Sequence, residues 1–454
     1  MKIELRKLSC PDMTIPPAAP GITVEEYDAR IAALTQRAAC EWVLVYGDRE
    51  HCANLMYFTG YDPRFEEALL VVGPDQRRHL VVGNEGLAYA GLAGARIPYV
   101  LCQSMSLLGQ PRSDAPRLAD VLRELGLARG SRVGMVGWKY LEADECDEPG
   151  RPAYVPAHMV DAARSLTGSD GAVVDVTPVV MHPGSGLRAV MNSAAQIAAF
   201  EWSAMRACAA VFRIVYGARP GMTGYEAAGL AKYEGDPLSA HLMFVSGKDE
   251  IVGLCSPSAR RIEYGDGVTT AVSLWGSLSC RAGMMLGEPD AAFFDRVVAP
   301  YYAAVATWWR TIRIGLAGGD LYDVVTSAFG SAPFNSALNP GHLVSYDEWV
   351  HSPIRPGSAD RIASGMVFQS DIIPSPLQPG QALNCEDTCA IADGALRDEL
   401  REAYPEVWAR IDWRREFMRD QLGLDLAEEV LPLSMAPAYL PPFWLRADLV
   451  CAAG

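Results

Sequence analysis

Three histidines in the second half of the chain are the side chains best suited to move protons near neutral pH. His241, His342 and His351 carry imidazoles, whose charge changes close to pH 7. His342 follows a glycine at a predicted turn, and we expect it to act in catalysis, with His351 as a second catalytic candidate. His241 is a candidate for substrate contact. The chain has only seven histidines in 454 residues, so a histidine-rich metal site is not expected.

Two acidic residues lie within apolar, strand-like stretches. Asp371 is part of the run QSDIIP at residues 369–374, and Glu386 precedes an apolar run at residues 389–391. Two carboxylates that face one pocket would share a proton or bind a cation, because like charges close together raise one pKa. We therefore predict that Asp371 and Glu386 are catalytic residues.

Arg281 and Cys255 are candidates for contact with a substrate. Arg281 is either a counter-ion to buried acids or an anchor for a substrate carboxylate, which its forked guanidinium would suit, unless it is a surface residue. Cys255 is a candidate nucleophile, since a thiolate attacks amides and amidines when a base lowers its pKa. The alternative for Cys255 is an inert packing role.

The composition limits the partners of this protein. Half of its residues are apolar, which excludes wholesale disorder, and its formal net charge is −16. So acidic a surface disfavours binding to nucleic acid and to anionic membranes. No apolar stretch is long enough to span a bilayer, and the first residues lack the pattern of a signal peptide. We therefore expect a cytoplasmic protein with reduced thiols that acts on a small molecule.

The pattern of elements predicts an α/β domain over residues 1–190. A proline-containing arm at residues 11–20 is followed by a helix that Thr23 caps and that runs to about residue 39. Apolar runs at residues 68–72 and 80–82 flank a Gly-Pro-Asp turn and predict a hairpin. The other expected elements are a strand at 42–46, a helix at 117–127 and a strand at 133–136.

A second domain is predicted over residues 191–454. Ser193 is expected to cap a long helix at residues 194–216, and Thr223 with Glu226 forms a capping box. The region then predicts an α+β fold with an antiparallel sheet. Its strands are expected at 268–274, 366–373 and 389–391, around one further helical block at 289–314.

Six short motifs, in order along residues 54–388, resemble those of the creatinase, Xaa-Pro aminopeptidase and prolidase family. The resemblance implies that family's pita-bread fold for the C-terminal half, with a smaller α/β domain before it. The motifs are NLMYFTGY at residues 54–61 (a strand and turn), RPGMTGYE at 219–226, RIEYGD at 261–266, GH at 341–342, GMVF at 365–368 and NCEDT at 384–388.

The metal ligands of the family are only partly matched. Peptidases of the family hold two metal ions with two Asp, one His and two Glu, so that bridging carboxylates clamp both cations around a hydroxide. His342, Asp371 and Glu386 match the last three ligands, with Asp371 in place of a Glu.

Both early aspartates of that ligand set are missing. The resemblance places them near residues 268–273 and 279–282, and neither segment contains a carboxylate. Arg281 is expected to occupy the second position, where a cation would repel a metal ion. We therefore predict no catalytic metal pair, and no cofactor.

Creatinase is the family's example of catalysis without metal, with a histidine as acid and base and carboxylates that grip a guanidinium group. That histidine should lie within residues 253–258, which contain none, so the chain departs from creatinase as well. In creatinase-like dimers a loop of the N-terminal domain reaches the partner's active site. The resemblance therefore implies a homodimer in which Arg64 or Tyr61 contacts the substrate.

These observations favour a metal-independent hydrolase that cleaves a C–N bond in a small polar substrate, such as a guanidino, amide or dipeptide-like compound. A metal-dependent Xaa-Pro aminopeptidase or dipeptidase is the first alternative. The second is a non-catalytic protein that keeps the fold in order to bind a ligand or partner, because fold does not fix chemistry.

Overall fold

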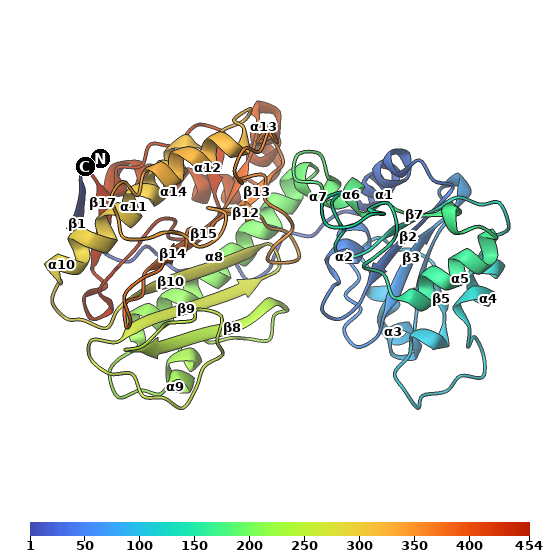
Figure 1. Cartoon of the computed structure of the whole chain (residues 1–454), viewed down its shortest axis with the longest axis horizontal. Helices are drawn as coiled ribbons and strands as arrows, with labels where there is room; N and C mark the ends of the chain where they lie inside the picture. Colours follow the sequence, from blue (N-terminus) through green and yellow to red (C-terminus); the bar gives the residue numbers. More distant parts are fainter. The chain divides into compact units, whose positions relative to one another are not determined.

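The computed structural model describes residues 1–454 and divides them into two compact units (Figure 1). One unit is Ile22–Met191, and the other combines Met1–Gly21 with Asn192–Gly454. The predicted N-terminal domain therefore begins too early. Strand β1 (Ile3–Lys7) pairs antiparallel with β17 (Leu449–Ala453), and this pairing joins the first residues to the C-terminal unit.

The N-terminal unit contains one six-stranded mixed sheet with the strand order β5-β4-β3-β2-β6-β7. The predicted hairpin is confirmed, since β3 and β4 pair antiparallel, whereas β2, β6 and β7 run parallel to one another. The strands are β2 (Trp42–Gly47), β3 (Ala68–Val72), β4 (Arg78–Val82), β5 (Tyr99–Leu101), β6 (Val133–Val136) and β7 (Val173–Asp175).

The helices of this unit confirm one predicted cap and correct one predicted strand. Thr23 caps α1, as predicted, by accepting a hydrogen bond from the backbone N–H of Glu26. Residues 54–61 are not a strand, because Ala53–Thr59 forms a helix whose residues are all buried, and a helix buried all round lacks an amphipathic pattern. The helices are α1 (Val24–Ala38), α2 (Ala53–Thr59), α3 (Asn84–Tyr89), α4 (Leu118–Leu125), α5 (Ala157–Thr167), α6 (Thr177–Met181) and α7 (Leu187–Val190).

The C-terminal unit is built on a seven-stranded antiparallel sheet with the order β12-β13-β15-β10-β9-β8, to which β16 adds by pairing with β15. Two further two-stranded sheets are formed by β1 with β17 and by β11 with β14. The strands are β8 (Leu238–Gly247), β9 (Gly267–Leu274), β10 (Ser277–Met284), β11 (Asn335–Ser336), β12 (His342–Leu343), β13 (Val367–Ser370), β14 (Pro374–Ser375), β15 (Asn384–Ile391) and β16 (Val430–Pro432).

Helix α8 (Ala194–Gly217) packs on β9 and β10, and its apolar residues share a core with Val268, Val272 and Leu274 of β9. The capping box at Thr223 is confirmed at the start of α9. The sequence predicted a single further helical block at residues 289–314, whereas three more helices form after residue 314. The remaining helices are α9 (Gly224–Gly229), α10 (Ala291–Phe293), α11 (Ala299–Thr311), α12 (Gly318–Ser327), α13 (Gly394–Ala403) and α14 (Pro405–Leu422).

The mixed helices and sheets confirm the predicted α+β class. No helix is both long and apolar enough to cross a membrane. Because successive side chains of a strand point to opposite faces, the residues of β9, β10 and β15 divide between a face covered by α8 and the opposite face. That division decides which residues can form a site.

Candidate functional site

His342 is held in place by a glycine that no other residue could replace without strain. Gly341 has a φ of +120°, and a Cβ atom built on it would lie 2.9 Å from the carbonyl oxygen of Gln369. That oxygen belongs to the residue that pairs with His342 between β12 and β13. The backbone therefore approaches β13 closely at this point and fixes the position of the imidazole.

The imidazole of His342 is completely buried and faces acidic groups. Its ring stacks on Trp349 with 4.1 Å between centroids, and its Nδ1 lies 3.2 Å from the carbonyl oxygen of Leu343. Its Nε2 lies 3.2 Å from Oε1 of Glu348 and 3.9 Å from Oδ2 of Asp371. Because Nδ1 faces a carbonyl, which only accepts hydrogen bonds, Nε2 is the nitrogen available for proton transfer.

Asp371 and Glu386 form a pair of buried carboxyl groups beside this imidazole. Ser370 pairs with Asp387 between β13 and β15, so the next residue of one strand lies opposite the preceding residue of the other. The charge of Glu386 acts on the carboxyl group of Asp371, and the amide of Asn384 donates a hydrogen bond to Oε1 of Glu386. The structure therefore brings Asp371, Glu386 and His342 together.

Burial and mutual repulsion change the protonation of this cluster. Burial, together with the charge of Glu348, raises the pKa of Glu386 to about 7. Burial and the neighbouring Glu386 hold the pKa of Asp371 well above its usual range. Burial alone would lower the pKa of His342, but the carboxylates of Glu348 and Asp371 outweigh it, so the pKa is raised. The carboxyl pair therefore keeps a proton to higher pH than free carboxyl groups do, and the imidazole stays charged to higher pH than a free histidine does.

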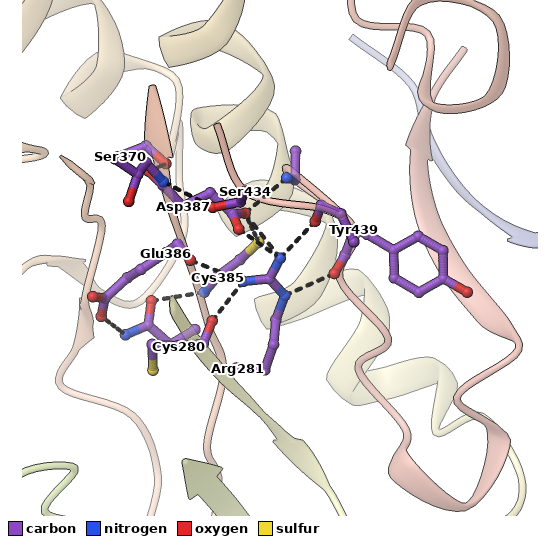
Figure 2. A network of polar contacts seen from close by, with 12 residues as sticks. Cys280, Arg281, Ser370, Cys385, Glu386, Asp387, Ser434 and Tyr439 are labelled. Atoms are coloured by element: carbon purple, nitrogen blue, oxygen red, sulfur yellow. Dashed lines mark hydrogen bonds and ion pairs between the residues drawn. The ribbon is translucent and has the colours of Figure 1, made fainter. Parts of the chain in front are cut away.

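The guanidinium of Arg281 is fully buried and reaches the cluster only at the backbone carbonyl of Glu386, 3.0 Å from its Nη1, which corrects its prediction as a substrate anchor. Its Nη2 donates to both carboxylate oxygens of Asp387, in an ion pair in which neither side chain is exposed. Its Nε also donates to the carbonyl of Tyr439, and the ring of Phe212 in α8 lies beneath it. Figure 2 shows Arg281 and Asp387 on one side of the strands and Glu386 on the other.

The positions near the two expected aspartates hold uncharged side chains on the Glu386 face. Cys280 is the residue of β10 that pairs with Glu386, and its Sγ lies 3.9 Å from Oγ1 of Thr269 in β9. Arg281, the next residue, points to the opposite face because side chains alternate along a strand. Cys280 also packs with Met243 and Ala271, so this part of the site is apolar.

These residues do not fit a pair of metal ions. A dinuclear site needs bridging carboxylates, whereas Thr269 offers a hydroxyl and Cys280 a thiol. One oxygen of Glu386 already accepts a hydrogen bond from the amide of Asn384. No group of three or more His, Cys, Asp or Glu side chains has a geometry that would hold a metal ion.

The other predicted residues of the C-terminal unit are placed differently. His351 lies at an isolated bridge with Leu343, and its Nδ1 accepts a hydrogen bond from the backbone N–H of Ser352, so its catalytic role stays a prediction. His241 and Cys255 are both exposed, and Nε2 of His241 lies 2.9 Å from the carbonyl of Leu254. No hydrogen bond or ion pair joins either residue to the His342 cluster, which argues against their predicted substrate contact.

The two candidates in the N-terminal unit have different surroundings. Tyr61 is only 3% exposed, and its ring stacks on Tyr89 with 5.3 Å between centroids, so it is a packing residue rather than a free contact residue. Arg64 is exposed, has a φ of +51°, and pairs with Asp62. Substrate contact by Arg64 stays a prediction.

Two residues of the cluster were missed in the sequence. Glu348 lies between the two candidate histidines, in a loop whose sequence gives no sign that its carboxylate turns toward His342. Cys280 is the uncharged neighbour of Arg281 in the sequence. Side chains alternate between the two faces of a strand, and this alternation is the sequence signal that places Cys280 on the opposite face from Arg281.

Comparisons with known proteins agree with this architecture. No protein-family model and no curated protein sequence matches the chain. Among solved structures, the prolidase of Pyrococcus horikoshii has a TM-score of 0.61 at 16% identity, covering 81% of this chain and 95% of that one.

Two other solved structures are similar to the same extent. The Xaa-Pro dipeptidase of Bacillus anthracis has a TM-score of 0.60 at 16% identity, over 82% of this chain and 96% of that one. The X-Pro aminopeptidase of Thermotoga maritima has a TM-score of 0.60 at 15% identity, over 81% and 95%. The chain therefore has the pita-bread fold of the creatinase, prolidase and Xaa-Pro aminopeptidase family.

Proposed function

We propose that this protein is a metal-independent hydrolase that cleaves a C–N bond in a small polar substrate. The observation that carries the proposal is the pair of buried carboxyl groups of Asp371 and Glu386, both with raised pKa values, beside the imidazole of His342. The solved structures of the same fold are named as peptidases, and peptidases cleave C–N bonds. The residues near the two aspartate positions do not suit bridging metal ions, for the reasons given above.

The cluster contains both an acid and a base. The ionised member of the carboxyl pair would take a proton from the attacking nucleophile, since a base works best when its pKa lies near the working pH. The charged imidazole of His342 would give its Nε2 proton to the departing nitrogen, and Glu348 would stabilise its charge. Such a reaction requires two titrating groups, one that accepts a proton and one that donates a proton, and their different surroundings set these two roles.

The excess of acid in the cluster indicates the charge of the substrate. The cluster holds three carboxyl groups and one imidazole: Asp371 and Glu386 are buried, and Glu348 is half-buried beside His342. A cationic or strongly hydrogen-bond-donating group would compensate that charge, so guanidino, amidine and amide compounds suit it better than carboxylates.

Hydrolysis in the absence of metal is the experiment that tests this function. The purified full-length protein would be treated with a chelator, analysed for residual metal, and assayed against guanidino acids, amides and Xaa-Pro dipeptides. We expect activity that chelation does not reduce, and its loss in His342→Gln and in Glu386→Gln. The exposed residues His158 and Glu399 provide matched controls, His158→Gln and Glu399→Gln, which should keep the activity.

Two outcomes would contradict the proposal. Activity that returns only with manganese, cobalt or zinc, with two ions bound per chain, would establish the metal-dependent peptidase instead. Ligand binding without any turnover, unchanged in His342→Gln and Glu386→Gln, would favour a non-catalytic binding protein.

We also propose that the chain acts as a homodimer, and that Arg64 contributes to substrate binding. Arg64 is exposed on a loop of the N-terminal unit, as a contact residue must be. Light scattering on the purified protein would measure the mass in solution. A monomer of 49.1 kDa at micromolar concentration that is fully active would overturn this proposal.

A further inference from the structure

Cys280 is a nucleophilic side chain that the roles described above do not use. It lies in the central strands of the sheet as the pairing partner of Glu386, and only 5% of it is exposed. Directly opposed residues of antiparallel strands have Cβ atoms about 5 Å apart, and their side chains share a face. Figure 2 shows Cys280 and Glu386 on the same side of the strands, away from Arg281 and Asp387.

A second observation points to a ligand at the same place. Oδ1 of Asp371 is buried and has no hydrogen-bond partner. Buried polar atoms are nearly always satisfied by protein, water or ligand, so this oxygen is a place for a hydrogen-bonding ligand. Asp371 belongs to the same acidic cluster as Glu386, the residue that pairs with Cys280.

We propose that Cys280 is the catalytic nucleophile and that the substrate is a small cationic amidine or guanidine. This inference rests on the proposed C–N hydrolase and names its substrate class and its covalent step. A planar cation with several N–H donors suits the paired carboxyl groups of Asp371 and Glu386, because such groups bind carboxylates with two parallel hydrogen bonds.

The charge of the substrate explains why a thiol would react here at all. Burial first, and then the charge of Glu386, raises the pKa of the Cys280 thiol, so the free protein keeps the thiol protonated and inert. A bound cation compensates the carboxylates and removes their part of that opposition. The nucleophile would therefore be activated only when a cationic substrate is in place.

The reaction balances with the groups present and one water molecule. The Sγ–H proton passes to Glu386 while the Sγ–C bond forms at the central carbon of the substrate. The C–N bond then breaks, and the departing nitrogen takes a proton from His342. Water attacks the same carbon and gives one proton to His342, and the Sγ–C bond breaks as the second proton returns to Sγ. The proton on Glu386 leaves with the amine, and the carbon is released as an amide or a urea.

Two probes of similar size and different charge test the site directly. 2-Chloroacetamidine is a cation and 2-chloroacetamide is neutral, and both alkylate a thiol with loss of chloride. We expect the cationic probe to label Cys280 at least ~10-fold faster than the neutral one, as one lost charge-assisted contact implies. The exposed Cys255 is the internal control, and it should react with both probes at similar rates.

Peptide mapping by mass spectrometry after labelling gives the readout for each cysteine. Asp371→Asn combined with Glu386→Gln should abolish the preference for the cationic probe at Cys280. Equal labelling of Cys280 by both probes, or labelling of Cys255 alone, would overturn the proposal.

Variants of Cys280 separate this inference from the proposed function. Cys280→Ser and Cys280→Ala should both lose turnover while their circular dichroism spectra stay unchanged, and the serine variant covers the case in which alanine prevents folding. If either variant hydrolyses substrate fully while His342→Gln does not, the proposed hydrolase is supported and the nucleophilic role of Cys280 is rejected. If the amidine labels Cys280 selectively but no compound is hydrolysed, the cation-activated thiol is supported and the proposed hydrolase is rejected.

Discussion

Arg281 and Asp387 form an ion pair between β10 and β15 in which neither side chain has any exposed surface. Nη2 of Arg281 lies 2.8 Å from one carboxylate oxygen and 3.0 Å from the other. The pair lies on the α8 face of the sheet, whereas the adjacent residues Cys280 and Glu386 face the opposite way. The same two strand segments therefore carry a structural ion pair on one face and the candidate site on the other.

Removal of one partner of this ion pair should destabilise the C-terminal unit strongly. Arg281→Met leaves Asp387 buried and unpaired, which typically costs about 3–5 kcal/mol. Urea unfolding followed by circular dichroism measures the loss. Arg401→Ala is the matched control, because Arg401 and Asp398 pair on the surface, where such pairs contribute less than about 1 kcal/mol. An equal loss of unfolding free energy in the two variants would show that the buried ion pair stabilises the protein no more than the surface pair does.

The pH dependence of activity should follow the carboxyl pair and His342. The base must be ionised, so kcat/KM should fall as the pH drops below the pKa of Glu386, which is about 7. The acid must be protonated, so activity should also fall above the raised pKa of His342. Glu348→Gln removes a charge that raises both pKa values, so both limbs should move to lower pH.

The expected displacement of both limbs is ~0.5 pH unit or more, since a shift of one unit corresponds to about 1.4 kcal/mol of interaction. Glu399→Gln, which alters an exposed carboxylate, should leave the profile unchanged. A profile that is identical in Glu348→Gln and the native protein would contradict the assigned roles of the cluster.

Glu386 should make the protein less stable at alkaline pH. Its pKa is raised from 4.5 to about 7 in the folded state, so the folded state binds the proton more tightly than the unfolded state. The resulting stabilisation is complete below pH 4.5 and is lost as the pH rises through 7. Its size is on the order of 3 kcal/mol for a shift of this kind.

Glu386→Gln should therefore flatten the dependence of unfolding free energy on pH between about 4.5 and 7.5. The measurement is urea unfolding at several pH values, with Glu399→Gln as the control that keeps the native dependence. A parallel loss of stability in Glu386→Gln and the native protein would show that Glu386 does not titrate in this range.

Gly341 should be required for the position of His342. Gly341→Ala would place a Cβ atom 2.9 Å from the carbonyl of Gln369 at a φ of +120°, which costs about 1–3 kcal/mol and displaces the imidazole. We expect kcat to fall by more than ~10-fold, because small misplacements of a reacting group reduce the rate steeply. Gly357→Ala is the control, since Gly357 has a φ of +66° but no atom near the added Cβ.

Comparing Gly341→Ala with Gly357→Ala separates the effect of the close contact with β13 from the effect of a positive φ, which both positions share. Both should lose some stability, and only Gly341→Ala should lose most of its activity. Equal activity in the two variants would contradict a positioning role for Gly341.

The sequence by itself determined the architecture and much of the cluster. Capping residues such as Ser193 and Thr223, the Gly-Pro-Asp hairpin and the ordered motifs predicted most of the elements, because these signals act within a few residues of the chain. His342, Asp371 and Glu386 were identified for the same reason, since each belongs to a local motif.

Only the tertiary structure decided which side chains share a face and which chain ends belong together. Arg281 and Cys280 are neighbours in sequence, yet strand alternation sends one toward α8 and the other toward Glu386. Glu348 reaches His342 through a loop, and β1 reaches β17 across the whole chain. Such contacts depend on strand register and on the approach of residues far apart in the sequence, and local sequence patterns encode neither. The structure therefore separates the three histidines: His342 is buried beside two carboxylates, His351 lies at a bridge with Leu343, and His241 is exposed.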